Sequence, residues 1–151
     1  MVKTVEMIVG LKVPDTTAIT ALQTLQKIGF SKINGIKRAD YYKFSIEGDV
    51  EKFKEKIAKV DMLVNANKHS SSFSVPKDNF VKVLVKNIND EQNAILSTLK
   101  NRLGFKDLKK IEKGTLWSLR IGAAEKQAKK IAERAAQDLL VNEHYQGFTI
   151  L

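Results

Sequence analysis

The chain repeats a pattern of residues at a nearly constant spacing along its 151 positions. With an offset of 75, the pair Gly29-Phe30 falls on Gly104-Phe105; with an offset of 77, Leu63-Val64-Asn65 falls on Leu140-Val141-Asn142. Further matches at the offset of 75 are Asp15 with Asp90, Ile36 with Ile111, Tyr42 with Trp117, Phe44 with Leu119 and Ile46 with Ile121. Ordered matches at one spacing indicate a repeated structural unit, so the sequence predicts one fold that occurs twice.

The first repeat reads as a succession of strands and helices. The β-rich segment 5–13 predicts a strand, and Asp15-Thr16-Thr17 supplies side-chain oxygens that start a helix. Gly29 follows that helix, where a left-handed cap favours glycine. The other expected elements are a short irregular strand at 31–38, a clear strand at 41–47, a second helix from Asp49 and a fourth strand at 72–75. Tyr42, Phe44 and Ile46 share the core face of the third strand, because successive strand residues alternate.

The second repeat follows the same order. Segment 80–88 predicts a strand, and Asn89-Asp90-Glu91 predicts a helix start. The other expected elements are strands at 106–113, 116–122 and 148–151 and a second helix with the apolar stripe Ala128, Ile131, Ala135 and Leu139. The order βαββαβ, twice, predicts an α+β fold of two tandem ferredoxin-like units, each a four-stranded antiparallel sheet with both helices on one face.

The predicted domains are residues 1–75 and 80–151, joined by a short linker at 76–79. The strands that open the repeats carry apolar residues on both faces: Val5, Met7 and Val9 as well as Ile8, and Val81 and Val83 as well as Leu84. Helices cover one face only, so the other face is too apolar to leave in water. The sequence therefore predicts that the halves pack sheet against sheet as a pseudo-dimer, or that the protein forms homo-oligomers.

Basic residues outnumber acidic ones by 26 to 17, which gives a formal net charge of +9. The excess is spread evenly, because residues 1–75 hold 12 basic and 8 acidic side chains and residues 76–151 hold 14 and 9. This spread favours solubility over a nucleic-acid-binding arm. The chain has no cysteine and no run of about 18 apolar residues, so we expect a cytoplasmic protein without disulfides or a membrane span.

No motif for catalysis or metal binding stands out. The only histidines are His69 and His144, and the chain lacks zinc-ligand spacing, a glycine-rich phosphate loop and a nucleophile elbow. Asp49 and Glu51 are explained by the dipole of the helix that they begin. We therefore expect no catalytic residue, no metal site and no cofactor of the protein's own.

The residues also suggest surfaces for binding. The basic segment 106–113 could form, with Lys32, Lys37 and Arg38, a rim that faces an acidic partner. Tyr41 is expected to point outward from its strand. The candidate partner contacts are Lys37, Arg38, Tyr41, Lys43, Asn65, Lys110, Lys113, Arg120 and Asn142. Two alternatives stay open: a tandem small-molecule-sensing domain of the amino-acid-binding regulatory kind, or weak RNA binding. For RNA, the second repeat offers no outward aromatic residue.

Two stretches resemble the small S subunit of phosphoribosylformylglycinamidine synthase, a PurS-like family. They are GIKRADYYKFSIEGDVEKF with LVNANKH in the first repeat, and KIEKGTLWSLRIGAAEKQAKKIAERAAQDLLVNEHYQGFTI in the second. Arg38 matches the family's arginine and Gly114 its glycine, while Ala66 and Glu143 stand where the family has proline after asparagine.

The resemblance implies an accessory subunit of an ATP- and glutamine-dependent C–N ligase of de novo purine biosynthesis. In that family the subunit carries no catalytic residues; it bridges the glutaminase subunit to the large synthetase subunit and helps ammonia pass between them. ATP, Mg and glutamine are used by the parent complex. A tandem copy would place a dimer in one chain.

Overall fold

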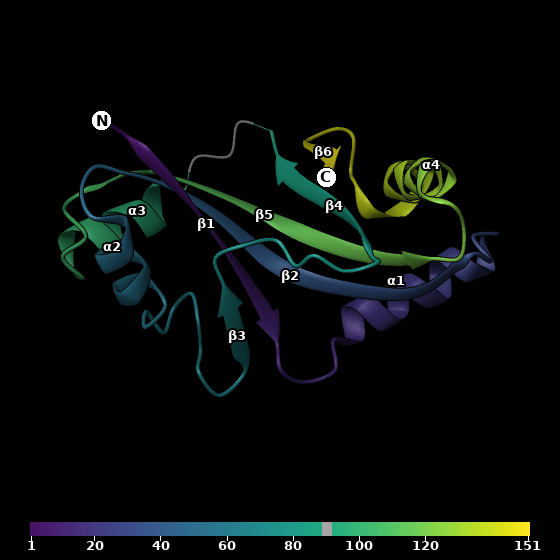
Figure 1. Ribbon diagram of the computed structural model, residues 1–151, viewed down its shortest axis with the longest axis horizontal. Helices are drawn as coiled ribbons and strands as arrows, with labels where there is room; N and C mark the ends of the chain where they lie inside the picture. The colour runs from purple at the N-terminus through teal and green to yellow at the C-terminus, as the bar shows by residue number, and fades with distance from the viewer. Residues whose placement is uncertain (89–91) are drawn as a thin grey trace. The chain divides into compact units, whose positions relative to one another are not determined.

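The computed structural model describes residues 1–88 and 92–151 (Figure 1). The elements are β1 (Lys3–Leu11), α1 (Thr16–Lys27), β2 (Ile33–Ile46), α2 (Val50–Ile57), β3 (His69–Ser72), β4 (Val81–Asn87), α3 (Asn93–Asn101), β5 (Leu108–Ile121), α4 (Glu125–Ala135), the π-helical turn η1 (Ala136–Leu140) and β6 (Gln146–Ile150). The helix start expected at Asn89-Asp90-Glu91 lies outside the described residues. No described helix is both long enough and apolar enough to cross a membrane.

The strands form one six-stranded sheet of order β3-β1-β2-β5-β4-β6. β1 pairs antiparallel with β3, with Leu11 opposite His69. β4 pairs antiparallel with β5 and β6, with Val83 opposite Trp117 and Ile150. The α+β class is confirmed. Face-to-face packing of two separate sheets within the chain is wrong, because strands from both halves belong to the same sheet.

The two longest strands each replace two predicted strands. β2 runs without a break through Ala39-Asp40, and β5 runs through Gly114. Gly114 lies opposite Lys86, where an added Cβ would come within 2.6 Å of the Val85 carbonyl oxygen. Glycine at this position therefore allows close strand pairing, and it does not end the strand. The predicted breaks between 38 and 41 and between 113 and 116 are wrong.

The chain forms two compact units that interleave along the sequence. Unit 1 consists of Met1–Lys12, Asp40–Val75 and Asn89–Lys113, and unit 2 consists of Val13–Ala39, Pro76–Ile88 and Gly114–Leu151. β2 and β5 each contribute residues to both units. The two halves 1–75 and 80–151 therefore each supply parts of both units.

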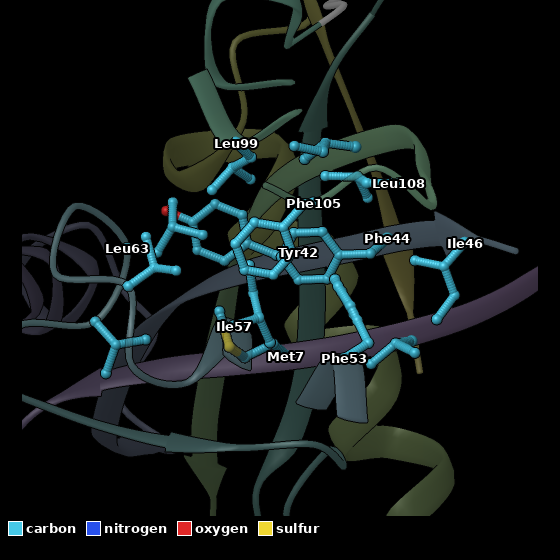
Figure 2. Packing of buried hydrophobic residues seen from close by; sticks show 14 of the residues in the cluster. Met7, Tyr42, Phe44, Ile46, Phe53, Ile57, Leu63, Leu99, Phe105 and Leu108 are labelled. Atoms are coloured by element: carbon cyan, nitrogen blue, oxygen red, sulfur yellow. The ribbon is translucent and has the colours of Figure 1, made fainter. Parts of the chain in front are cut away.

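Aromatic rings fill the core of unit 1 (Figure 2). Phe44 is 0% exposed and stacks on Tyr42, with the ring centroids 5.9 Å apart. Phe53 of α2 meets Phe44 edge-on at 5.2 Å and meets Phe105 edge-on at 5.7 Å. Edge-to-face and offset contacts at such distances are favourable beyond the apolar area that they bury. The predicted core face of Tyr42, Phe44 and Ile46 is confirmed.

Small side chains bring α4 close to the strands of unit 2. Ala128, Ala132 and Ala135 lie at helical spacing and are buried. Ala132 and Ala135 belong to the same buried cluster as Trp117 and Leu119 of β5, and their small side chains leave room for these larger ones. The burial predicted for Ala128 and Ala135 is confirmed.

The turn η1 changes which residues face the core of unit 2. The Val141 N–H donates to the Ala136 carbonyl at 2.9 Å, which is the i to i+5 bond of a π-helix. A π-helical turn holds one more residue than an α-helical turn, so its side chains are rotated relative to the apolar face of α4. Leu139 is 38% exposed as a result. The predicted burial of Leu139 is wrong for this reason.

A buried lysine holds the segment before β4 in unit 2. The Lys82 side chain is 6% exposed and forms an ion pair with Asp78. The Lys82 Nζ lies 5.3 Å from the centroid of the Phe80 ring, and the Lys37 Nζ lies 4.7 Å from it. Burial acts to raise the pKa of Asp78, but the hydrogen bonds from Lys82 and the Phe80 N–H and the charges of Lys82 and Lys37 outweigh it, so the pKa is lowered.

Apolar residues on the second face of the strands are covered within the chain. Ile8 and Leu84 are each 6% exposed. Tyr41 is 3% exposed, and its hydroxyl donates to Glu6 Oε2 at 2.6 Å. Burial, together with the hydrogen bond to Glu6, raises the pKa of Tyr41 above its ordinary value. The expected exposure of Tyr41 is wrong, and Ile8 and Leu84 need no neighbouring molecule to shelter them.

Candidate functional site

The predicted partner contacts are divided between the two units. Unit 1 holds Tyr41, Lys43, Asn65, Lys110 and Lys113, and unit 2 holds Lys37, Arg38, Arg120 and Asn142. In unit 1, Lys110 and Lys113 are exposed, and the Lys113 Nζ lies 5.6 Å from the centroid of the Tyr42 ring. Lys43 is half-buried. Burial, with the charge of Asp40 adding to it, raises the pKa of Tyr42 to about 12, so Tyr42 stays neutral beside Lys113.

Arg120 bonds to the neighbouring strand of unit 2. Its Nε donates to Asn34 Oδ1 at 2.7 Å, and its Nη2 donates to the Asn34 carbonyl at 3.2 Å. A Cβ added to Gly35 would lie 3.3 Å from the Arg120 side chain, so glycine leaves room for this arrangement. The Arg120 side chain is exposed but already engaged, and the Lys37 Nζ lies over the Phe80 ring.

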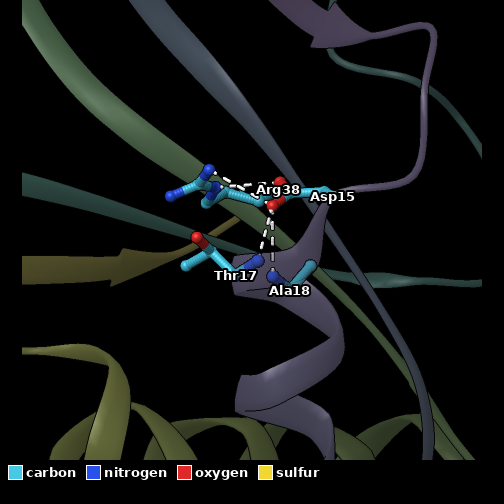
Figure 3. Close-up of polar contacts among 4 residues, drawn as sticks. All are labelled: Asp15, Thr17, Ala18 and Arg38. Atoms are coloured by element: carbon cyan, nitrogen blue, oxygen red, sulfur yellow. Dashed lines mark hydrogen bonds and ion pairs between the residues drawn. The ribbon is translucent and has the colours of Figure 1, made fainter.

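Arg38 is paired with the residue that begins α1 (Figure 3). Asp15 accepts hydrogen bonds from the N–H groups of Thr17 and Ala18 at 3.0 and 3.2 Å. The same carboxylate accepts from Arg38 Nε at 3.0 Å and from Arg38 Nη2 at 3.2 Å. The expected helix start at Asp15 is confirmed. Arg38 therefore has a structural role, and its part in partner binding stays a prediction.

We expect Asp15→Ala to lower the free energy of unfolding by about 2 kcal/mol, because it removes both a helix cap and a two-point charged hydrogen bond. Asp49→Ala is the matched control. Asp49 caps α2 by accepting from the N–H groups of Glu51 and Lys52 at 2.9 and 3.2 Å, without an arginine. Its loss is expected to cost about 1 kcal/mol. Urea unfolding of both variants measures the difference, and equal losses would show that Arg38 adds nothing.

The repeated asparagines form the same turn in each unit. Asn65 Oδ1 accepts from the Asn67 N–H at 3.0 Å, and Asn142 Oδ1 accepts from the His144 N–H at 3.1 Å. The residue four positions later closes each turn: His69 Nδ1 accepts from the Asn65 N–H at 3.0 Å, and Gln146 Oε1 accepts from the Asn142 N–H at 2.9 Å. These bonds explain why asparagine recurs at the end of both Leu-Val-Asn segments.

The two turns also fix where the last strand of each half begins. The N–H groups of His69 and Gln146 donate to the carbonyls of Asn65 and Asn142 at 2.7 and 2.8 Å. β3 then starts at His69 and β6 at Gln146. The strands predicted at 72–75 and 148–151 therefore start too late. In structural terms, His69 corresponds to Gln146 and not to His144.

The titratable groups of the described residues do not assemble into a metal site. Within residues 1–88 and 92–151, no group of three or more His, Asp or Glu side chains lies close enough together to hold a metal ion. The carboxylates of Asp15 and Asp49 bond to helix N–H groups, and Glu6 bonds to Tyr41.

Unit 1 carries an open groove beyond the end of α2, with a volume of about 650 Å³. Its lining residues are Lys56, Lys59, Val60, Asp61, Met62, Thr98, Arg102, Leu103 and Phe105, and we call it the helix-end groove. Met62 is 50% exposed and Leu103 is 44% exposed, so large apolar side chains face solvent there. The Lys56 Nζ lies 4.6 Å from the centroid of the Phe105 ring.

Unit 2 has a smaller groove beyond the end of α1 and beside α4. Its volume is about 280 Å³, and it is lined by Ile28, Gly29, Phe30, Ser31, Lys32, Gln127, Ile131, Arg134 and Asp138. Phe30 and Phe105 correspond at the offset of 75, and Asp61 and Asp138 correspond at 77. Neither groove could be predicted from the sequence, because the residues that line each groove come from segments far apart in the chain.

Residues 80–151 match the PurS family model, described as phosphoribosylformylglycinamidine (FGAM) synthase. The match covers β4, α3, β5, α4, η1 and β6. A search of curated proteins returns no match.

Proposed function

We propose that the protein is a non-catalytic subunit of phosphoribosylformylglycinamidine synthase in purine biosynthesis. In this role it bridges the glutaminase subunit and the large synthetase subunit and aids the transfer of ammonia between them. The observation that carries the proposal is the match of residues 80–151 to the PurS family model. ATP, Mg and glutamine are used by the catalytic subunits and not by this chain.

We further propose that residues 1–75 are a second PurS-like copy. The paired turns support this view, because Asn65 and Asn142 make corresponding hydrogen bonds. The turns after α1 and α3 support it as well. Gly29 and Gly104 both have positive φ, at 112° and 77°, the backbone region in which glycine is least strained.

The proposal is tested by measuring synthase activity with each nitrogen source. Glutaminase and large subunits from the same source are assayed with and without the protein. We expect the protein to raise glutamine-dependent activity on the order of 10-fold or more, because it holds the ammonia donor and acceptor sites together. Ammonia-dependent activity of the large subunit should change much less. Equal dependence of both activities on the protein would contradict a bridging role.

A further inference from the structure

The helix-end groove of unit 1 combines positive charge with exposed apolar side chains. Lys56, Lys59 and Arg102 contribute three cations, and Asp61 contributes one carboxylate. Within the part of the chain that the structure describes, Lys59 and Arg102 form no ion pair. Their charge is therefore available to a bound molecule.

The apolar lining shows that the groove suits more than a simple anion. Met62 and Leu103 are both exposed within it. Methionine adapts its shape to an incoming side chain, and arginine is enriched at protein interfaces. A free phosphate ion would use the cations but would leave these apolar side chains in water. A protein segment that carries both carboxylates and an apolar side chain would use both features.

We propose that the helix-end groove binds an acidic segment of a partner protein, with one apolar side chain of that segment against Met62 and Leu103. This inference rests on the proposed function, in which the partner is a synthase subunit. Charge complementarity favours an acidic partner over a second copy of this chain, because the chain carries a net charge of +9.

The smaller groove of unit 2 provides a matched control. It offers Lys32 and Arg134 against Asp138, in a volume of about 280 Å³ compared with about 650 Å³. Reversing both of its cations in Lys32→Glu/Arg134→Glu lowers the net charge from +9 to +5, as Lys59→Glu/Arg102→Glu does, but leaves the helix-end groove intact. The difference between the two grooves then reports on the site and not on net charge.

The test compares the wild-type protein with Lys59→Glu/Arg102→Glu and with the charge-matched control Lys32→Glu/Arg134→Glu. Binding to the purified large and glutaminase subunits is measured by titration calorimetry, and circular dichroism confirms that each variant is folded. We expect Lys59→Glu/Arg102→Glu to bind one of the two subunits about 10-fold or more weakly, and Lys32→Glu/Arg134→Glu to stay within about 2-fold of wild type. Equal binding by all three proteins would overturn the inference.

A second probe separates this inference from the proposed function. A fluorescent peptide of alternating glutamate and leucine residues is titrated into the same three proteins. Binding by the wild type and by Lys32→Glu/Arg134→Glu, with about 10-fold or greater loss in Lys59→Glu/Arg102→Glu, supports the groove. Absent or equal peptide binding overturns it. Failure of the wild type to bind either synthase subunit would instead overturn the proposed function, while the peptide still decides the groove.

Discussion

Replacing Phe44 with alanine is expected to lower the free energy of unfolding by about 3–5 kcal/mol. Phe44 is 0% exposed and lies at the centre of the aromatic cluster of unit 1, between Tyr42 and Phe53. The substitution removes buried apolar area and leaves a cavity that rigid neighbouring rings do not fill. Because native domains are stable by only about 5–15 kcal/mol, this loss is a large part of the total.

The prediction is checked by guanidinium unfolding followed by far-UV circular dichroism. Phe73→Ala is the matched control, since Phe73 is half-buried at the margin of the same cluster. We expect Phe73→Ala to cost about 1–2 kcal/mol, because less area leaves water and no closed cavity forms. A loss for Phe44→Ala no larger than that for Phe73→Ala would contradict the structure of this core.

Asp78→Asn is expected to lower the free energy of unfolding by about 2–3 kcal/mol, because it leaves the Lys82 ammonium buried without a counter-charge. The Lys82 side chain is only 6% exposed, and Asp78 is its ion-pair partner. Asp78 itself is 36% exposed, so solvent weakens the attraction and the expected loss is below that of a fully buried pair.

Lys82→Met tests the cause of this loss. Methionine keeps most of the volume of the lysine stem and carries no charge, so we expect a change within about 1 kcal/mol in either direction. In the Lys82→Met background, Asp78→Asn should then have little effect. If Asp78→Asn costs the same in both backgrounds, the loss comes from the loop and not from the buried ammonium.

The same pair predicts a dependence of stability on pH. The pKa of Asp78 is lowered in the folded protein, so the unfolded chain binds a proton at this site more readily than the folded one. The contribution of the pair is therefore complete above the unfolded pKa of about 4 and is lost as pH falls through the lower, folded pKa. The wild type should lose more stability between pH 5 and pH 2 than the Lys82→Met/Asp78→Asn variant, to an extent that urea unfolding measures.

Local chemistry in the sequence predicted much of the secondary structure. The helix starts at Asp15 and Asp49 follow from side chains that accept helix N–H groups, and both are observed. The alternation of apolar residues predicted the core face of Tyr42 and Phe44, because successive strand residues point to opposite sides of a sheet. These features depend on neighbours within a few positions, which a sequence displays directly.

Features set by distant residues could not be predicted in this way. Alternation placed Tyr41 on the second face, but only the folded chain shows that Tyr41 is covered and bonded to Glu6. The π-helical bond from Val141 to Ala136 moved Leu139 outward, and no local signal marks it. The helix-end groove was missed because Met62 and Leu103 come together only in the folded unit.

The continuity of β2 and β5 has a consequence for proteolysis of the chain. Neither residues 1–75 nor residues 80–151 contain all of either unit, so cleavage within 76–79 would yield no independently folded fragment. The two pieces would instead remain a non-covalent complex whose stability depends on protein concentration. In the intact chain the tether makes this association intramolecular, at an effective concentration in the millimolar range for a short linker, so dilution does not undo the fold.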